Sequence, residues 1–203
     1  EQIREELDDR FMQITNWLLF GMQDFDFISE DSVPELWENT QFGAMEYDTF
    51  IVPGCKTMRR TTLSMLKVMK IVGKKIIFVG DIPELLDAEQ SDEIQKFAQG
   101  CECVEYSQNA ILEAVESDRL VDMHFYGPKH LKKPNEKKDW NGVRTWKYLY
   151  QMRQDGERRY IFIANGRKCE NDDLVLEDNV KISIKGCWEI TLLDTMNGEE
   201  RNL

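Results

Sequence analysis

The stretch 47–81 constrains the fold of this chain more than any other part of the sequence. An apolar run over 47–52, rich in β-branched and aromatic residues, ends at Pro53-Gly54, and a helical pattern follows it. A second apolar run over 75–79 then ends at Gly80-Asp81. Strands with consecutive apolar residues are typical of parallel sheets that helices cover on both faces. The stretch therefore predicts a βαβ unit in an α/β domain.

Helical and strand patterns alternate on both sides of this unit. Together they predict a flavodoxin-like doubly wound parallel sheet for residues 1–122. The amphipathic first helix is expected to end at Gly21, because glycine commonly caps helix C-termini. The other expected elements are a strand over 25–28, a short helix through Pro34, Leu36 and Trp37, a helix beginning at Ser91, a strand over 101–106 and a helix capped by Ser107.

The character of the sequence changes near Leu120. Residues 123–142 are expected to form a solvated linker or long loop rather than a binding patch, since they are rich in Gly, Pro and Lys without periodicity. Beyond them, alternating apolar residues on either side of Asp155-Gly156 predict a hairpin. Residues 143–203 therefore predict a small antiparallel β module, an incomplete sandwich. Its later strands are expected over 174–176, 180–184 and 188–193, with Asn197-Gly198 as the last turn.

Composition excludes several classes of function. Lys and Arg total 26 against 38 Asp and Glu, and a net charge of −12 disfavours nucleic-acid binding. No apolar run reaches the roughly 18 residues that a membrane helix needs, and residues 1–10 do not resemble a signal peptide. An odd number of cysteines favours reduced thiols and a cytoplasmic location, although a longer parent protein could be exported. The first residue, Glu1, is not methionine, so we expect a piece of a longer protein.

The sequence predicts neither a metal site nor a cofactor. Cys101-x-Cys103 lacks the spacing of common zinc sites, and the only histidines are His124 and His130. No phosphate-cradling glycine motif is present. An acidic Mg²⁺ cluster is also considered, but the central strand ends in Pro-Gly rather than aspartate, so capping or solvated roles are expected for its members. These members would be Asp24, Asp26 and Asp81.

Two groups of side chains are candidates for chemistry or binding. Cys55 follows a strand, where α/β enzymes often place nucleophiles, but a structural turn role is the favoured interpretation because no base is evident nearby. Aromatic residues of the β module could instead stack on sugars, although a small module needs such side chains in its core. The candidates for a sugar-binding surface are Trp140, Trp146 and Trp188, with Tyr148 and Tyr150 beside them.

Four segments carry a resemblance to known proteins. They are 24–36 (DFDFISEDSVPEL), 46–88, 147–166 and 188–199. The third fits R-x-x-G-x-x-x-Y-x-F-x-x-N through Arg153, Gly156, Tyr160, Phe162 and Asn165. The fourth fits W-E-(I/L)-x-x-x-D-x-x-x-G-E through Trp188, Glu189, Asp194, Gly198 and Glu199. In this order the segments resemble the C-terminal half of large bacterial glycoside hydrolases of the α-L-rhamnosidase-like and β-galactosidase-like kind.

The resemblance implies an accessory role. In such enzymes a catalytic (β/α)₈ barrel precedes a glutamine-amidotransferase-like α/β domain, akin to the β-galactosidase trimerisation domain, and a β domain follows. The amidotransferase nucleophile ends the strand after the Pro-Gly loop, but here that strand ends in Val79-Gly80-Asp81. An inactive relative is therefore implied, and the barrel with its catalytic carboxylates is absent.

We therefore predict a non-catalytic accessory fragment of a multidomain glycoside hydrolase that acts on carbohydrates. Its expected partners are the catalytic barrel of the same parent chain, a second copy in a homo-oligomer and carbohydrate. Trp37, Phe42 and the loops after Val52 and Val79 are expected to face the barrel or a neighbouring protomer. The alternatives are a cysteine amidohydrolase that uses Cys55 and a carbohydrate-binding module.

Overall fold

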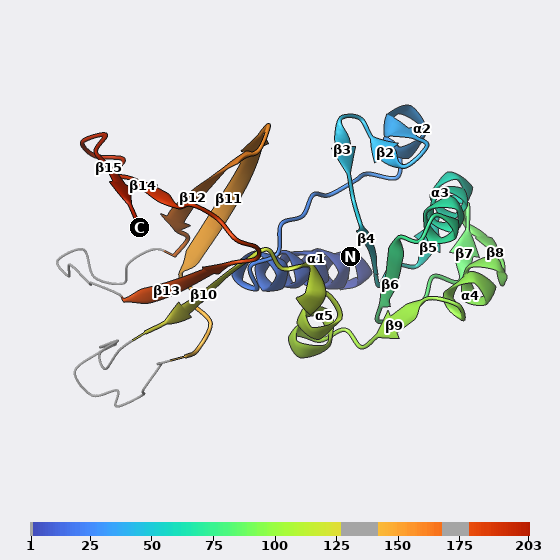
Figure 1. Cartoon of the computed structure of the whole chain (residues 1–203). Coiled ribbons are helices and arrows are strands. Elements are labelled where there is room, and N and C mark those ends of the chain that lie inside the picture. Colours follow the sequence, from blue (N-terminus) through green and yellow to red (C-terminus); the bar gives the residue numbers. More distant parts are fainter. Residues whose placement is uncertain (1, 127–141, 168–178) are drawn as a thin grey trace, which may run out of the picture.

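A computed structural model describes residues 2–126, 142–167 and 179–203. Figure 1 shows an α/β part, residues 2–120, and a β part, which comprises 121–126, 142–167 and 179–203. Helix α1 (Gln2–Phe20) lies between them. Within the described residues, no helix combines the length and apolar character needed to cross a membrane.

A three-stranded parallel sheet forms the centre of the α/β part. Its strands are β4 (Thr49–Pro53), β6 (Lys75–Val79) and β9 (Glu102–Val104), in the order β4-β6-β9. Residues 49–53 pair in parallel with 75–79, so the predicted βαβ unit is confirmed. The connections run through α3 (Arg60–Ile71) and α4 (Glu93–Ala98). The chain is thus a mixed α/β protein with a parallel sheet.

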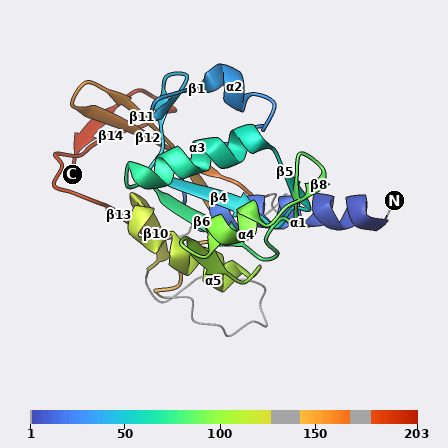
Figure 2. The same ribbon diagram turned by 90° about the vertical axis from the view of Figure 1, so that its right-hand side faces the viewer.

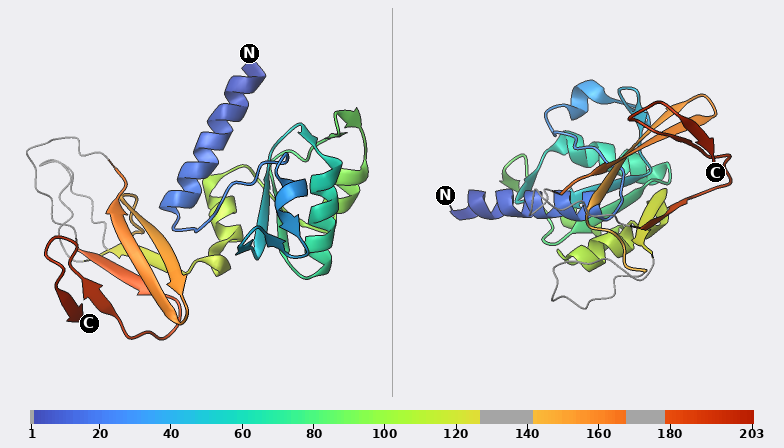
Figure 3. Two further views of the ribbon diagram at one scale, coloured as in Figure 1. Left: turned by 90° about the horizontal axis from the view of Figure 1, so that it is seen from above. Right: turned by 90° about the vertical axis from the view of Figure 1, so that its left-hand side faces the viewer.

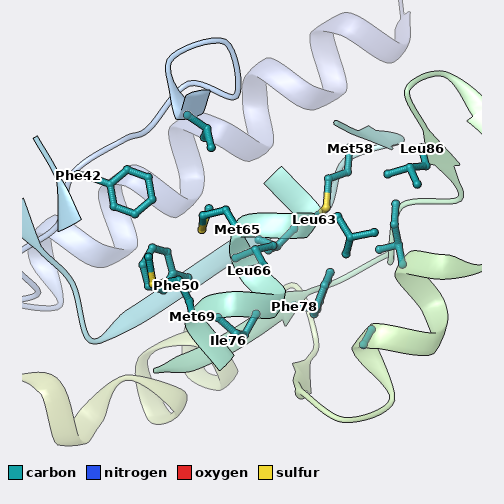
Figure 4. Packing of buried hydrophobic residues seen from close by; sticks show 14 residues of the cluster. Phe42, Phe50, Met58, Leu63, Met65, Leu66, Met69, Ile76, Phe78 and Leu86 are labelled. Atoms are coloured by element: carbon teal, nitrogen blue, oxygen red, sulfur yellow. The ribbon is translucent and has the colours of Figure 1, made fainter. Parts of the chain in front are cut away.

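Helices cover both faces of this sheet. On one face, α3 and α4 enclose a large apolar cluster that includes Phe50, Phe78 and Leu66 (Figure 4). Figure 2 shows α3 lying across β4 and β6 on this side. On the other face, α1 and α5 (Gln108–Ala114) pack against Ile77 and Val79. Strand β6 is apolar at consecutive positions because each of its faces is covered.

Several short elements complete the α/β part. The strand predicted over 25–28 is absent: this segment is extended without a strand partner. Instead, the Phe27 ring lies 4.6 Å from the Phe11 ring of α1. The short elements are α2 (Val33–Leu36), an antiparallel sheet of β1 (Trp37–Glu38), β2 (Gln41–Phe42) and β3 (Met45–Glu46), a sheet of β5 (Thr57–Met58), β7 (Leu85–Leu86) and β8 (Glu89–Gln90), and the 3₁₀ turn η1 (Glu116–Asp118).

The β part consists of three two-stranded antiparallel sheets in the described residues. Strands β11 (Tyr148–Asp155) and β12 (Arg158–Asn165) form the predicted hairpin, and Gly156 adopts a φ of 58° in its turn. Strand β10 (Val121–Phe125) pairs with β13 (Val180–Ile184). Strand β14 (Thr191–Leu193) pairs with β15 (Glu200–Asn202) around the predicted Asn197-Gly198 turn.

Strand β10 corrects the predicted linker. Residues 123–125 were expected to belong to a linker over 123–142, but they form the second half of β10. The sequence Val-Asp-Met-His-Phe alternates apolar and polar residues, which is the ordinary signal of a half-buried strand. The remaining predicted linker, apart from 126 and 142, and the strand expected over 174–176 lie outside the described residues.

The end of α1 joins the two parts. The Met22 side chain is fully buried in a cluster with Val121 and Met123 of β10. The Arg119 Nε donates a hydrogen bond to the Gly21 carbonyl oxygen at 2.9 Å. The helix ends near Gly21 as predicted, but Met22 rather than Gly21 takes the left-handed conformation, with φ 60°. Figure 3 shows the first turns of α1 extending beyond both parts.

Candidate functional site

The carboxyl edge of the parallel sheet is the usual position of a ligand-binding site in an α/β domain. Ligands of open α/β sheets usually bind there, at a point where the strand order reverses. The order β4-β6-β9 contains no such reversal among the described parallel strands. Pro53 ends β4 and Gly54 follows it, and Gly80-Asp81 follows β6 at this edge. A methyl group added at Gly54 would lie only 3.2 Å from the Val79 carbonyl oxygen, so the two loops are in close contact.

Arg10 of α1 lies at this edge. Its Nη1 lies 3.6 Å from Asp81 Oδ2, and its Nη2 lies 2.7 Å from Glu6 Oε1. The guanidinium carbon is 5.4 Å from the centre of the Tyr106 ring, which follows β9. The Tyr106 hydroxyl donates a hydrogen bond to the Arg10 carbonyl oxygen. The loops after β4 and β6 contact this chain's own helix through Arg10, while Pro53, Lys56 and Asp81 are exposed. The expectation that these loops face a barrel or a neighbouring protomer therefore stays a prediction.

The surroundings of Cys55 oppose a nucleophilic role. The residue is partly buried against the large apolar cluster of the α/β part. Burial, with a smaller effect from the Glu30 carboxylate, raises the pKa of the thiol to about 11. A nucleophilic cysteine needs the opposite shift and a nearby base. His124 lies on β10 in the β part, where its Nε2 is 3.8 Å from Asp122 Oδ2, and His130 lies outside the described residues.

The three aspartates considered for a metal do not meet. Asp24 and Asp26 line a cavity of about 260 Å³ beside the amino end of β4, whereas Asp81 lies at the opposite edge of the sheet. Burial, followed by the charge of Asp26, raises the pKa of Asp24, and Arg153 opposes this shift. The Tyr47 hydroxyl donates a 2.7 Å hydrogen bond to Asp26 Oδ2. Over the part of the chain that the structure describes, no group of three or more His, Cys, Asp or Glu could hold a metal ion.

The two candidate tryptophans that the structure describes, Trp146 and Trp188, lie in different regions. Trp188 is 40% exposed, its indole N–H donates to the Lys185 carbonyl oxygen at 2.9 Å, and the Arg159 guanidinium lies 4.7 Å from its ring centre. Trp146 lines a different region, a cavity between α1 and the β part. Trp140 lies outside the described residues. Tyr148 and Tyr150 pack on the cluster around Met22, which agrees with their favoured role as core residues.

The cavity beside Trp146 is larger than the cavity of about 260 Å³ beside β4. It has a volume of about 640 Å³, and we call it the junction cavity. Residues far apart in the sequence form it, which is why no local pattern indicated it. Its walls are Asp9, Met12, Gln13, Asn16, Trp17, Phe20, Gly21, Gln108, Leu112, Arg144, Thr145, Trp146 and Arg167.

A group of exposed apolar side chains marks the β part, and we call it the apolar β surface. On β12, Tyr160 and Phe162 are 55% and 59% exposed. Further members lie on β13 and around β14. Soluble domains generally keep exposed apolar side chains scattered, and comparable ones also occur on the α/β part, such as Met45 and Ile71. The apolar β surface comprises Tyr160, Phe162, Ile182, Ile190, Leu192, Leu193 and Met196.

Two residues expected at an interface lie elsewhere. Phe42 is buried in the core of the α/β part, with its ring 5.8 Å from that of Phe50. The expectation that Phe42 faces a partner is therefore wrong. Trp37 is partly buried, and its indole N–H donates to the Asn39 carbonyl oxygen at 2.8 Å. Trp37 thus packs partly against this chain's own core.

Comparisons with protein-family models, curated proteins and solved structures find no match to this chain.

Proposed function

We propose that this chain is a non-catalytic accessory part of a multidomain glycoside hydrolase, supporting its catalytic barrel or its subunit assembly. The observation that carries the proposal is that Arg10 of the chain's own first helix, paired with Glu6 and Asp81, lies at the carboxyl edge of the sheet. An α/β enzyme needs that edge open for its substrate. Here it holds an arginine paired with carboxylates, and a thiol whose pKa is raised to about 11.

The apolar β surface supports a role in assembly. Burying apolar area against another protein contributes about 25 cal/mol per Å². Large exposed groups such as Phe162 and Leu192 are therefore the side chains that we expect to contact a partner. The partner in this proposal is the catalytic barrel of the same parent chain or a second copy in a homo-oligomer.

The class of the parent enzyme, a glycoside hydrolase, is inferred from the sequence resemblance. Helices on both faces of the parallel sheet are compatible with the flavodoxin-like, amidotransferase-like domain that the resemblance implies. Carbohydrate as the substrate of the parent enzyme and a cytoplasmic location belong to the same proposal. The cysteine amidohydrolase alternative loses support from the buried Cys55.

The proposal is tested on the longer coding sequence. The region upstream of Glu1 is sequenced, and its product is expressed with and without residues 1–203. We expect codons for a barrel, and hydrolysis of p-nitrophenyl glycosides only when the barrel is present. Deletion of the 203 residues should lower thermal stability or subunit assembly. A start codon directly before Glu1, or glycoside hydrolysis by this chain alone, would refute the proposal.

A pair of leucine variants tests the apolar β surface in that longer protein. Leu192→Lys places a charge on the surface, and we expect weaker assembly, measured by light scattering. Leu36→Lys is the matched control, because Leu36 is similarly exposed on α2 in the α/β part. Equal effects of the two substitutions would show that the apolar β surface has no special role.

A further inference from the structure

The junction cavity has the size of a small-molecule site. Its volume of about 640 Å³ falls within the range of about 300 to 1,000 Å³ that is usual for ligand pockets. It lies where α1 and α5 meet the segment that leads into β11. Such junctions between units are common positions for ligand sites, because neither unit fills the space alone.

Aromatic side chains from different segments stand in its walls, and each is held by a neighbour. The Trp17 ring packs on the Tyr106 ring at 5.5 Å. The Arg167 guanidinium lies 4.3 Å from the centre of the Phe20 ring. The Trp146 ring makes an edge contact with Phe125 at 4.7 Å. Rings fixed in this way offer rigid apolar surface to a ligand at little entropic cost.

The polar groups of the cavity are mostly uncharged or already neutralised. Arg144 makes two hydrogen bonds with the Asp122 carboxylate, at 2.7 and 2.9 Å, so its charge is balanced. Arg167 and Asp9 carry opposite charges. The remaining polar walls include amides, which both donate and accept hydrogen bonds. These amides belong to Gln13, Asn16 and Gln108.

Thr145 is the most deeply buried polar residue in the cavity wall. Its side chain is only 1% exposed, and its Oγ1 has no hydrogen-bond partner among the described residues. A buried hydroxyl without a partner costs roughly 1 to 3 kcal/mol. The Oγ1 atom is itself inaccessible to solvent, so it lies behind the cavity wall and is not among the groups that a ligand would contact.

We propose that the junction cavity binds a neutral monosaccharide or disaccharide. A pyranose ring presents C–H faces to aromatic rings and hydroxyl groups to amides, which matches the two kinds of wall. A purely apolar ligand would leave the amides without partners. An anionic ligand would find Arg144 already paired with Asp122. This inference rests on the cavity alone and stands independently of the proposed accessory role.

The experiment uses the full chain and a panel of probes: methyl glycosides of hexoses and 6-deoxyhexoses, with lactose and maltose. Binding is detected by saturation-transfer NMR and measured by calorimetry. Gln13→Ala and Gln108→Ala each remove an exposed amide of the cavity without touching the core, and circular dichroism verifies their folding. We expect each to weaken binding about fivefold, the value of one hydrogen bond.

Two control variants separate this site from others. Gln151→Ala removes a matched exposed amide on β11, away from the cavity, and should leave binding unchanged. Trp188→Phe tests the other exposed tryptophan and should also leave binding unchanged. No binding by any member of the panel would overturn the inference. Binding that resists both cavity variants, or that is lost with Trp188→Phe, would overturn it as well. These binding measurements do not depend on whether a barrel is encoded upstream.

Discussion

At the scale of single residues, the surroundings of Cys55 determine its reactivity. The thiol lies against the apolar cluster and near the Glu30 carboxylate, and both disfavour the negatively charged thiolate. Only the thiolate reacts rapidly with alkylating reagents. With a pKa of about 11, very little of Cys55 is in this form at neutral pH.

This predicts slow alkylation of Cys55. At pH 8, iodoacetamide should modify it about a hundredfold more slowly than a cysteine with the ordinary pKa near 8.5. The rate should rise until the pH passes about 11. Mass spectrometry of the labelled peptide gives the rate. Glu30→Gln removes a negative charge and should increase the rate. If Cys55 is labelled fastest of the thiols at neutral pH, the amidohydrolase alternative regains support.

At the scale of elements, α5 shows a working helix cap. The Ser107 side chain accepts a 3.3 Å hydrogen bond from the Ala110 N–H, as expected for an N-cap. Ser32 occupies the same position before α2 but makes no side-chain cap bond. The pair allows the value of the hydrogen bond to be measured within one protein.

Ser107→Ala should lower the free energy of unfolding by about 1 kcal/mol, because an N–H of α5 loses its partner. Ser32→Ala should change it by much less. Urea denaturation followed by circular dichroism measures both. Equal losses would show that the Ser107 cap bond is not formed in solution.

The packing of α1 on α5 gives a second prediction for the elements. A methyl group at Gly21 would lie 2.3 Å from Leu112 Cδ2 and 2.5 Å from the Trp17 carbonyl oxygen. Gly21→Ala should therefore destabilise the chain by about 1 to 3 kcal/mol through overpacking. At Gly100 the nearest atom is the flexible end of Lys70, so Gly100→Ala is the control with a small effect. Thermal unfolding of the two variants measures both losses of stability and allows them to be compared.

Elements with strong periodicity were predictable from the sequence, and others were not. The bounds of β6 and β13 agree with the predicted 75–79 and 180–184, because uninterrupted or alternating apolar residues mark them. The alternation in 25–28 was misleading, since its phenyl rings pack against α1 and no strand pairs with it. The junction cavity left no local signal, because Trp17, Gln108 and Thr145 meet only after folding.

At the scale of the whole molecule, Met22 connects the two parts. It lies two residues after α1, whose Ile14 and Leu18 pack on the parallel sheet, and it fills the cluster formed with β10. Cooperative unfolding of both parts depends on such shared buried contacts. The strength of this connection can be measured by removing one side chain.

Met22→Ala should cost about 2 to 5 kcal/mol, the usual range for a buried methionine. We also expect calorimetry to resolve two transitions in place of one, since the β part loses its main apolar contact with α1. Met45→Ala is the control, because Met45 is 51% exposed. A single sharp transition at an unchanged temperature would refute the connecting role of Met22.

The position of α1 has a practical consequence for dividing this chain into pieces. A dissection guided by the βαβ pattern would begin a shortened protein near Tyr47 and discard α1. That cut would remove Arg10 from the sheet edge, one apolar layer from the sheet and Met22 from the β part. Limited proteolysis within 23–46 should therefore yield two fragments that stay together until a denaturant separates them. Any shorter version intended for study should retain the helix from before Arg10.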